Sequence, residues 1–294
     1  MIPKVAVIIP TRNRRESLLK LLKSLKYQLL LPVVVLVVDS SDEIICPSDY
    51  NFEKNIKILV SNRKSAAHQR NLGIRTILTE YPFIDFVSFL DDDVEISSDY
   101  LRRSISQLVE HIDVVGVSGI ARATNNIYSS KSLVSRLVLA RHKAGSISKS
   151  LINISPCSLK EISYVDWLIG CSSWKRAVFN YTLFEDDFEG QSLFEDVIFS
   201  YRASRIGKLI VDPSIEIQHN LSSEGRPNTR IHYESWVVNR ARLFQYSDTE
   251  FSRIAYLMTI LFVIFKYLPS ALLARNEARE KILGVFSGFV KIVS

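Results

Sequence analysis

Short apolar runs, separated by stretches with helical spacing, constrain the fold of this 294-residue chain more than any other feature. The runs are continuous rather than alternating, as in strands whose two faces are both covered. Four of them lie in the first ninety residues, at 5–9, 33–38, 56–60 and 84–90. Leucines at helical spacing follow the first run, and residues 66–81 have the spacing of a helix. The pattern predicts an α/β fold with a mostly parallel sheet and helices on both faces.

Polar residues follow these runs at the points where the expected strands end. They are Thr11, Asp39, Asn62 and the triplet Asp91–Asp93. In open α/β sheets, ligands bind in the crevice outside the carboxyl ends of the strands, so we expect these residues around one site. No Gly-x-Gly-x-x-Gly motif follows the first run, so the usual dinucleotide-binding fingerprint is absent.

The triplet Asp91-Asp92-Asp93 is difficult to explain by folding alone. Like charges repel, and carboxylates beside apolar surface are costly unless a cation meets them. Mg²⁺ and Mn²⁺ prefer oxygen ligands and commonly bridge a carboxylate to a substrate phosphate. A solvated acidic turn is the alternative, but carboxylates in a loop after a buried strand often carry function. The triplet therefore predicts a metal–diphosphate site.

Further elements follow the triplet. The sequence predicts a helix from Asp99 to Ile112 with Ser98 as its N-cap, and strands at 114–121 and 208–211. A polar cluster lies at 165–171. Another, Glu195-Asp196, opens an expected helix that Gly207 ends.

Several segments, in this order, resemble the family-two glycosyltransferases, which are nucleotide-sugar enzymes with a GT-A fold. The matching segments are VAVIIPTRNR at 5–14, VLVVDSSD at 35–42, AAHQRNLGI at 66–74, FLDDDVEI at 89–96, VDWLIGCSSWKR at 165–176 and FEDVIFSYRASRIGKLIVDP at 194–213. The resemblance extends over residues 3–220. It implies an inverting, metal-dependent transfer of a sugar from a nucleotide-sugar, with a UDP-sugar favoured, to an acceptor hydroxyl.

For the donor, the resemblance implies that Asp39 recognises the nucleotide base, with Thr11 and Arg12 in the same pocket and Arg70 reaching the nucleotide. An aspartate at a strand end can instead cap a turn, and a helix arginine can simply be solvated.

The family's acidic motif matches Asp91 and Asp93, with Asp92 between them on the donor side. We expect Asp93 to contact Mn²⁺ or Mg²⁺, and Asp91 to contact the ribose or the same metal. His219 is a further candidate metal ligand, although a lone histidine at a strand end is often structural.

On the acceptor side, the resemblance implies that Asp196 is the general base, while Glu195 fixes acceptor or sugar hydroxyls. Two acids at a helix start can instead serve only the helix dipole. Asp166, Trp167 and Gly170 are expected to line the acceptor and sugar pocket, although Trp167 could equally belong to the core.

We expect a GT-A domain at 1–238 and a helical region at 239–294 that associates with a membrane or forms oligomers. The domain would comprise a nucleotide-sugar-binding half at 1–121, a basic mobile flap at 122–160 and a catalytic half at 161–238. The flap contributes strongly to the net charge of +6, because 114–160 holds seven Lys and Arg and no acid. Such charge favours phosphates or a membrane surface, and no nucleic-acid module is recognised.

The apolar run at 254–265 leaves three interpretations open: a core or dimer helix, an interfacial membrane anchor, or a re-entrant hairpin. The run is shorter than the roughly 20 residues that a membrane span needs, and the flanking arginines favour the interfacial anchor. Together with the basic flap, it predicts an acceptor such as a glycan on a polyprenyl-linked lipid, used in surface polysaccharide assembly.

The expected location is the cytoplasmic, inner face of the cell membrane. Cys46, Cys157 and Cys171 fit neither a zinc pattern nor a disulfide framework, and the first apolar run is too short for a signal peptide. Two alternatives stay open. A sugar nucleotidyltransferase would normally carry a glycine-rich loop after the first strand, and an inactive membrane-tethered scaffold would bind a nucleotide without turnover.

Overall fold

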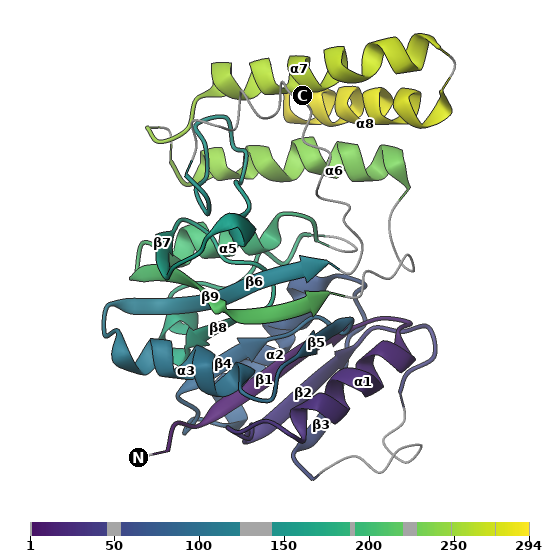
Figure 1. The fold of residues 1–294 in the computed structure, drawn as a ribbon. Coiled ribbons are helices and arrows are strands. Elements are labelled where there is room, and N and C mark those ends of the chain that lie inside the picture. Colours follow the sequence, from purple (N-terminus) through teal and green to yellow (C-terminus); the bar gives the residue numbers. More distant parts are fainter. Residues whose placement is uncertain are drawn as a thin grey trace.

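A mixed sheet forms the centre of the computed structural model, which describes residues 2–45, 54–123, 143–188, 192–219, 228–247, 249–273 and 275–293 (Figure 1). Within these residues nine strands form one sheet in the order β3-β2-β1-β4-β8-β6-β9-β5, and β7 also pairs with β9. The strands are β1 (Val5–Thr11), β2 (Val34–Asp39), β3 (Ile56–Val60), β4 (Phe86–Phe89), β5 (Val94–Ile96), β6 (Val114–Ala123), β7 (Ser163–Val165), β8 (Ser172–Lys175) and β9 (Lys208–His219).

The longer strand pairings are parallel, which confirms the predicted fold class. Strands β3, β2, β1 and β4 form one parallel block, and β6 pairs in parallel with β9. Strand β8 runs antiparallel between the two blocks, and β5 and β7 are antiparallel to β9. These three short strands were not predicted, because three or four residues carry too little periodicity to stand out from a loop.

Helices cover both faces of the sheet. They are α1 (Arg15–Leu25), α2 (Ala66–Glu80), α3 (Tyr100–Glu110), α5 (Glu195–Ala203), α6 (Thr229–Ala241), α7 (Arg253–Leu272) and α8 (Asn276–Val293), with short 3₁₀ helices η2 (Pro156–Ser158), η3 (Arg176–Asn180) and η4 (Arg242–Gln245). The structure has two hydrophobic cores, one on each face of the sheet, and alternate residues of β1 belong to each of them. Val7 packs with α1 and α3, whereas Ile8 packs with α2 and α5. Both sets are apolar, which explains the continuous run in the sequence.

The start of α3 differs from the prediction. The N-cap position is Asp99 rather than Ser98, and no side chain caps the helix. The Asp99 carboxylate accepts hydrogen bonds from Ser97 and from Arg103 in the first helical turn, so it does not reach the free backbone amides. The predicted Ser98 cap is therefore wrong.

Three helices, α6, α7 and α8, form a layer above α5, stacked on the side away from β1–β3 (Figure 1). Helix α8 packs closely on α6, because a Cβ at Gly284 would lie 2.3 Å from the backbone oxygen of Arg230. The expected boundary between residues 238 and 239 falls inside α6. The division into domains and a mobile flap stays a prediction, and residues 124–142 of the expected flap lie outside the described residues.

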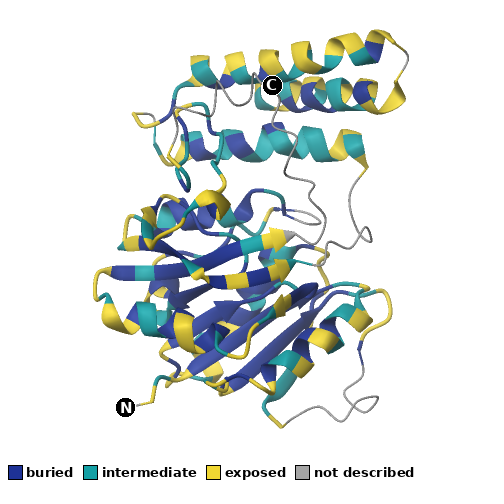
Figure 2. Cartoon of the chain, viewed as in Figure 1, coloured by how far each residue is buried: buried dark blue, intermediate teal, exposed yellow. Residues whose placement is uncertain are grey.

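Much of the outer surface of this layer, on α7 and α8, is exposed (Figure 2). Of the described helices, α7 alone is long and apolar enough to cross a membrane, by length and composition only, with a mean hydropathy of 1.7. Large apolar side chains of α7 and α8 are exposed at helical spacing, and we call them the apolar face: Ile254, Leu257, Met258, Leu261, Phe265, Leu268, Leu272, Leu283, Phe286, Val290 and Val293.

Candidate active site

The carboxyl ends of β1, β2 and β4 meet, as the sequence predicted. Asp39 ends β2 and is fully buried, and its two carboxylate oxygens accept hydrogen bonds from the amides of Ser41 (2.8 Å) and Ile45 (2.9 Å). These are the contacts of a turn-capping aspartate. A role in recognising the nucleotide base stays a prediction.

Asp92, the middle member of the triplet, has the best-defined contacts. Thr11 Oγ1 donates to Asp92 Oδ2 at 2.7 Å, and Arg14 Nη1 donates to Asp92 Oδ1 at 3.1 Å and to Asp93 Oδ2 at 3.0 Å. Burial raises the pKa of Asp92 to about 6, although these donors oppose the shift. Arg14 therefore places a positive charge against Asp92 and Asp93, a contact that was not predicted from the sequence.

Asp93 also faces His219, the last residue of β9. His219 Nε2 lies 2.9 Å from Asp93 Oδ1, because β5 pairs with β9 and sets His219 opposite Val94. The hydrogen bond to Asp93 raises the pKa of His219.

A divalent cation fits these residues only in part. Among the described residues, no three His, Cys, Asp or Glu side chains form a group that could hold a metal ion. Asp93 and His219 offer one carboxylate and one imidazole, while Asp91 turns toward Arg70. A cation bound by so few side chains would take its other ligands from substrate phosphates and water.

Arg70 joins the two halves of the site. It extends from α2, donates from Nη2 to Asp91 Oδ1 at 2.8 Å, and donates from Nη1 to the Glu195 carboxylate. Arg70 is only 3% exposed, so the alternative of a solvated helix arginine is wrong. Burial raises the pKa of Glu195 to about 8, and the charge of Arg70 opposes this shift.

Asp196 follows Glu195 in the first turn of α5. Its Oδ1 accepts a hydrogen bond from the Val197 amide at 2.8 Å, and burial raises its pKa to about 6. Phe194, which precedes Glu195, has a φ of 78° and a ψ of 5°, in the left-handed region. Glu195 and Asp196 therefore follow directly after a strained turn.

Gly170 lies against the Arg70 group, at the predicted pocket. A Cβ on Gly170 would lie 3.2 Å from Arg70 Nη2 and 3.5 Å from Asp91 Oδ2, so the missing side chain leaves room beside both. Next to it, Cys171 is buried, and its Sγ accepts the Asp91 amide hydrogen at 3.3 Å. Burial raises the pKa of this thiol well above its usual range.

Asp166 and Trp167 contact a different part of the chain. The exposed Asp166 accepts a hydrogen bond from the Ile147 amide at 2.8 Å. Trp167 is buried in the large core cluster and donates from its indole to the Ile154 oxygen at 3.1 Å. Their place in an acceptor pocket stays a prediction.

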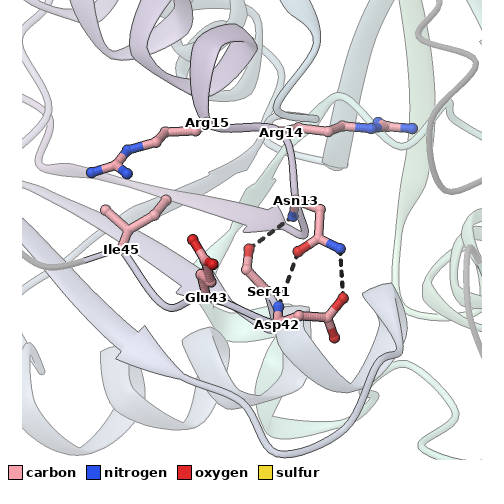
Figure 3. A pocket seen from close by; sticks show the side chains of 7 residues that line it. All are labelled: Asn13, Arg14, Arg15, Ser41, Asp42, Glu43 and Ile45. Atoms are coloured by element: carbon pink, nitrogen blue, oxygen red, sulfur yellow. Dashed lines mark hydrogen bonds between the residues drawn. The ribbon is translucent and has the colours of Figure 1, made fainter.

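A cavity of about 340 Å³ opens beside the carboxyl ends of β1 and β2, between the turns that follow these strands (Figure 3). Its lining residues are Asn13, Arg14, Arg15, Ser41, Asp42, Glu43 and Ile45. Asn13 holds the two turns together, because it exchanges hydrogen bonds with Asp42 and its amide donates to Ser41 Oγ. Arg12, expected in this region, pairs loosely with Asp42 at 3.8 Å.

The comparisons with known proteins agree with this architecture. The family model for glycosyl transferase family 2 matches residues 6–161, and the chain belongs to this family. It is therefore a glycosyltransferase by family. A search for relatives among curated proteins found no match.

Similar solved structures are only distantly related in sequence. S. aureus TarS 1–349 is 18% identical with a TM-score of 0.55, and the match covers 84% of this chain and 67% of that one. The same TarS fragment in complex with UDP-GlcNAc is 19% identical with a TM-score of 0.54, covering 84% and 68%. GalNAc-T7 with UDP, GalNAc and Mn²⁺ is 13% identical with a TM-score of 0.58, covering 81% and 48%. At these identities the similarity shows a shared GT-A fold.

Proposed function

We propose that this glycosyltransferase transfers a sugar from a UDP-sugar to an acceptor hydroxyl with inversion. The observation that carries the proposal is the double pairing of Arg70 with Asp91 and Glu195. This pairing connects the carboxyl end of β4, where the aspartate triplet lies, to the start of α5, where Asp196 lies. Structures of similar fold, TarS and GalNAc-T7, were solved with UDP, which supports the choice of nucleotide.

On the donor side, the cavity beside Asp39 would take the nucleotide, with the diphosphate directed toward the aspartate triplet. Arg14 lies between this cavity and the triplet and offers a positive charge to the phosphates. Asp93 and His219 would hold Mn²⁺ or Mg²⁺, which when bound neutralises the diphosphate leaving group.

On the acceptor side, Asp196 would remove the proton from the attacking hydroxyl. A pKa of about 6 leaves its carboxylate ionised at neutral pH and more basic than an ordinary aspartate. Glu195, held by Arg70, would fix the position of a sugar or acceptor hydroxyl.

The acceptor is proposed to be a glycan on a polyprenyl-linked lipid, used at the cytoplasmic face of the cell membrane for surface polysaccharide assembly. The apolar face of α7 and α8 supports contact with a bilayer surface, because such faces favour the interface between head groups and acyl chains. Arg253 and Arg275 lie at the two ends of α7, where they can meet anionic head groups.

A transfer assay with Asp196→Asn tests the chemistry. The change should lower kcat by about a hundredfold or more, which is typical for loss of a general base, without changing UDP affinity. The matched control is Asp113→Asn, an exposed carboxylate that pairs with Lys208 away from the site. Wild-type rates in Asp196→Asn would refute the base assignment.

Three other outcomes separate the alternatives. Formation of a nucleotide-sugar from a sugar phosphate would indicate a nucleotidyltransferase, and UDP binding without any turnover would indicate a scaffold. Equal rates on a free sugar and on its polyprenyl-pyrophosphate conjugate, with no liposome binding, would refute the lipid-linked acceptor.

A further inference from the structure

Helix α6 contacts the turn that leads into Glu195 and Asp196. Asn239 Nδ2 donates to the backbone oxygen of Leu193 at 2.8 Å. The guanidinium of Arg240 lies 4.5 Å from the centroid of the Phe194 ring. Two consecutive residues of α6 therefore hold two consecutive residues of the turn.

This turn needs outside support. Phe194 adopts a left-handed backbone conformation, and Ser192, two residues earlier, has a φ of 52°. For residues other than glycine such conformations cost about 1–3 kcal/mol each, and they persist only where the surroundings fix them. Phe194 is also the N-cap of α5, yet no side chain caps this helix. The geometry of the turn, which sets the direction of Asp196, thus depends on contacts with other elements, among them those of Ser192 Oγ with Ser65 Oγ and with the Ala67 amide, both at 3.2 Å.

Arg240 is an unusual residue for packing. It is 8% exposed, and within the part of the chain that the structure describes it forms no ion pair. Its hydrogen bonds go to the Trp236 oxygen and to Asn153 Oδ1, and its flat face covers aromatic rings. Burial lowers its pKa to about 10, while the charge of Asp196 acts in the opposite direction. The guanidinium is therefore a buried positive charge whose contacts are aromatic rings and neutral oxygen atoms.

The rest of the C-terminal layer fixes α6. The buried Tyr256 of α7 donates from its hydroxyl to the Val237 oxygen at 2.5 Å. On α8, a Cβ at Gly288 would lie 2.7 Å from Val237 Cβ, so α8 and α6 are in close contact at the same residue. Contacts thus continue from α7 and α8 through α6 to the turn.

We propose that Asn239 and Arg240 are positioning residues for sugar transfer, which hold the Leu193–Phe194 turn so that Asp196 meets the acceptor hydroxyl. The inference rests on the proposed function. It makes the C-terminal layer part of the catalytic unit as well as a surface for binding.

Asn239→Ala tests the inference, with Arg240→Lys as a second variant that keeps the charge and loses the planar guanidinium. The matched control is Tyr267→Phe, which removes one α6–α7 hydrogen bond, between the hydroxyls of Tyr233 and Tyr267, far from the turn. Hydrogen exchange of peptides spanning 192–200 and transfer kinetics are both measured. In the two test variants, exchange should become faster and kcat should fall about tenfold or more, with donor KM within about twofold. The control should match the wild type in both.

Unchanged exchange or unchanged kcat in both test variants would overturn the inference, as would equal losses in Tyr267→Phe. Failure of the proposed function is distinguishable, because it would remove transfer from the wild type itself. Exchange in Asn239→Ala would then still show whether α6 holds the turn.

Discussion

Replacement of Arg70 by methionine tests the central ion pair of the site. Two charge-assisted hydrogen bonds are lost, each worth about 1.5–3 kcal/mol. The Asp91 side chain is 31% exposed and can regain water, whereas Glu195 is 7% exposed and cannot. We therefore expect the free energy of unfolding to fall by about 3 kcal/mol at pH 7, which is the sum of the two hydrogen bonds at the lower end of that range.

The loss should grow at higher pH. The folded-state pKa of Glu195 lies above its unfolded value, so this group stabilises the fold at low pH, and the stabilisation is lost as pH rises toward the folded pKa. In the wild type this loss of stability ends near pH 8. Without Arg70 the pKa of Glu195 rises further, so the free energy of unfolding continues to fall above pH 8. The variant should therefore lose about 1.4 kcal/mol more than the wild type between pH 8 and pH 9.

Urea denaturation at pH 7, 8 and 9 measures these differences. The double variant Arg70→Met, Glu195→Gln should lose the extra pH dependence, since the buried carboxyl group is gone. Arg75→Met is the matched control, because Arg75 lies on the same helix but forms an exposed pair with Asp186. A loss in Arg70→Met that is equal at pH 7 and pH 9 would refute the reasoning.

Three further predictions follow from the same structure. The kcat/KM of transfer should fall tenfold per pH unit below about pH 6, because protonation removes the proposed base Asp196; a profile that stays flat to pH 4 would contradict its raised pKa. Thr11→Val should cost about 1.5 kcal/mol in urea unfolding, since a buried oxygen of Asp92 loses its donor; no loss would mean that another group replaces it. Gly119→Ala should cost about 3 kcal/mol or more, because the new Cβ would lie 1.8 Å from the Ile215 oxygen, and a variant with wild-type thermal stability would exclude this contact.

The sequence predicted which polar side chains lie at the carboxyl ends of the strands, because strand ends are encoded locally. Continuous apolar runs located β1, β2 and β3 closely, and the polar residues that follow them were expected at one edge. Asp93 and His219 were both expected at one metal site from the resemblance to the family, and the structure places their side chains 2.9 Å apart.

The sequence could not predict that Arg14 is the arginine that pairs with Asp92 and Asp93. The segment after β1 offers three arginines within four residues, and only the turn geometry turns Arg14 toward Asp92 while Arg12 faces Asp42. Nothing in their local sequence separates them. The same holds for Arg240, whose neighbours Phe194 and Asn153 are far away in the chain.

The helix predictions show a similar limit. Apolar spacing located α1 and α2, but it could not show that α6 would reach back to the turn before α5. Such long-range contacts depend on the packing of whole layers. The C-terminal helices could be expected from composition, while the contact of α6 with the turn could not.

Cys171 can report local opening of the site, because its thiol is buried there. The thiol is buried beneath Asp91, whereas Cys157 is exposed on the same chain. A thiol reagent should therefore modify Cys157 at once. It should modify Cys171 only when the loop that holds Asp91 opens, since the reactive form is the thiolate and burial disfavours it. The ratio of the two rates measures the free energy of that opening without any added label. A nucleotide that closes the loop would slow modification of Cys171 and leave Cys157 unchanged.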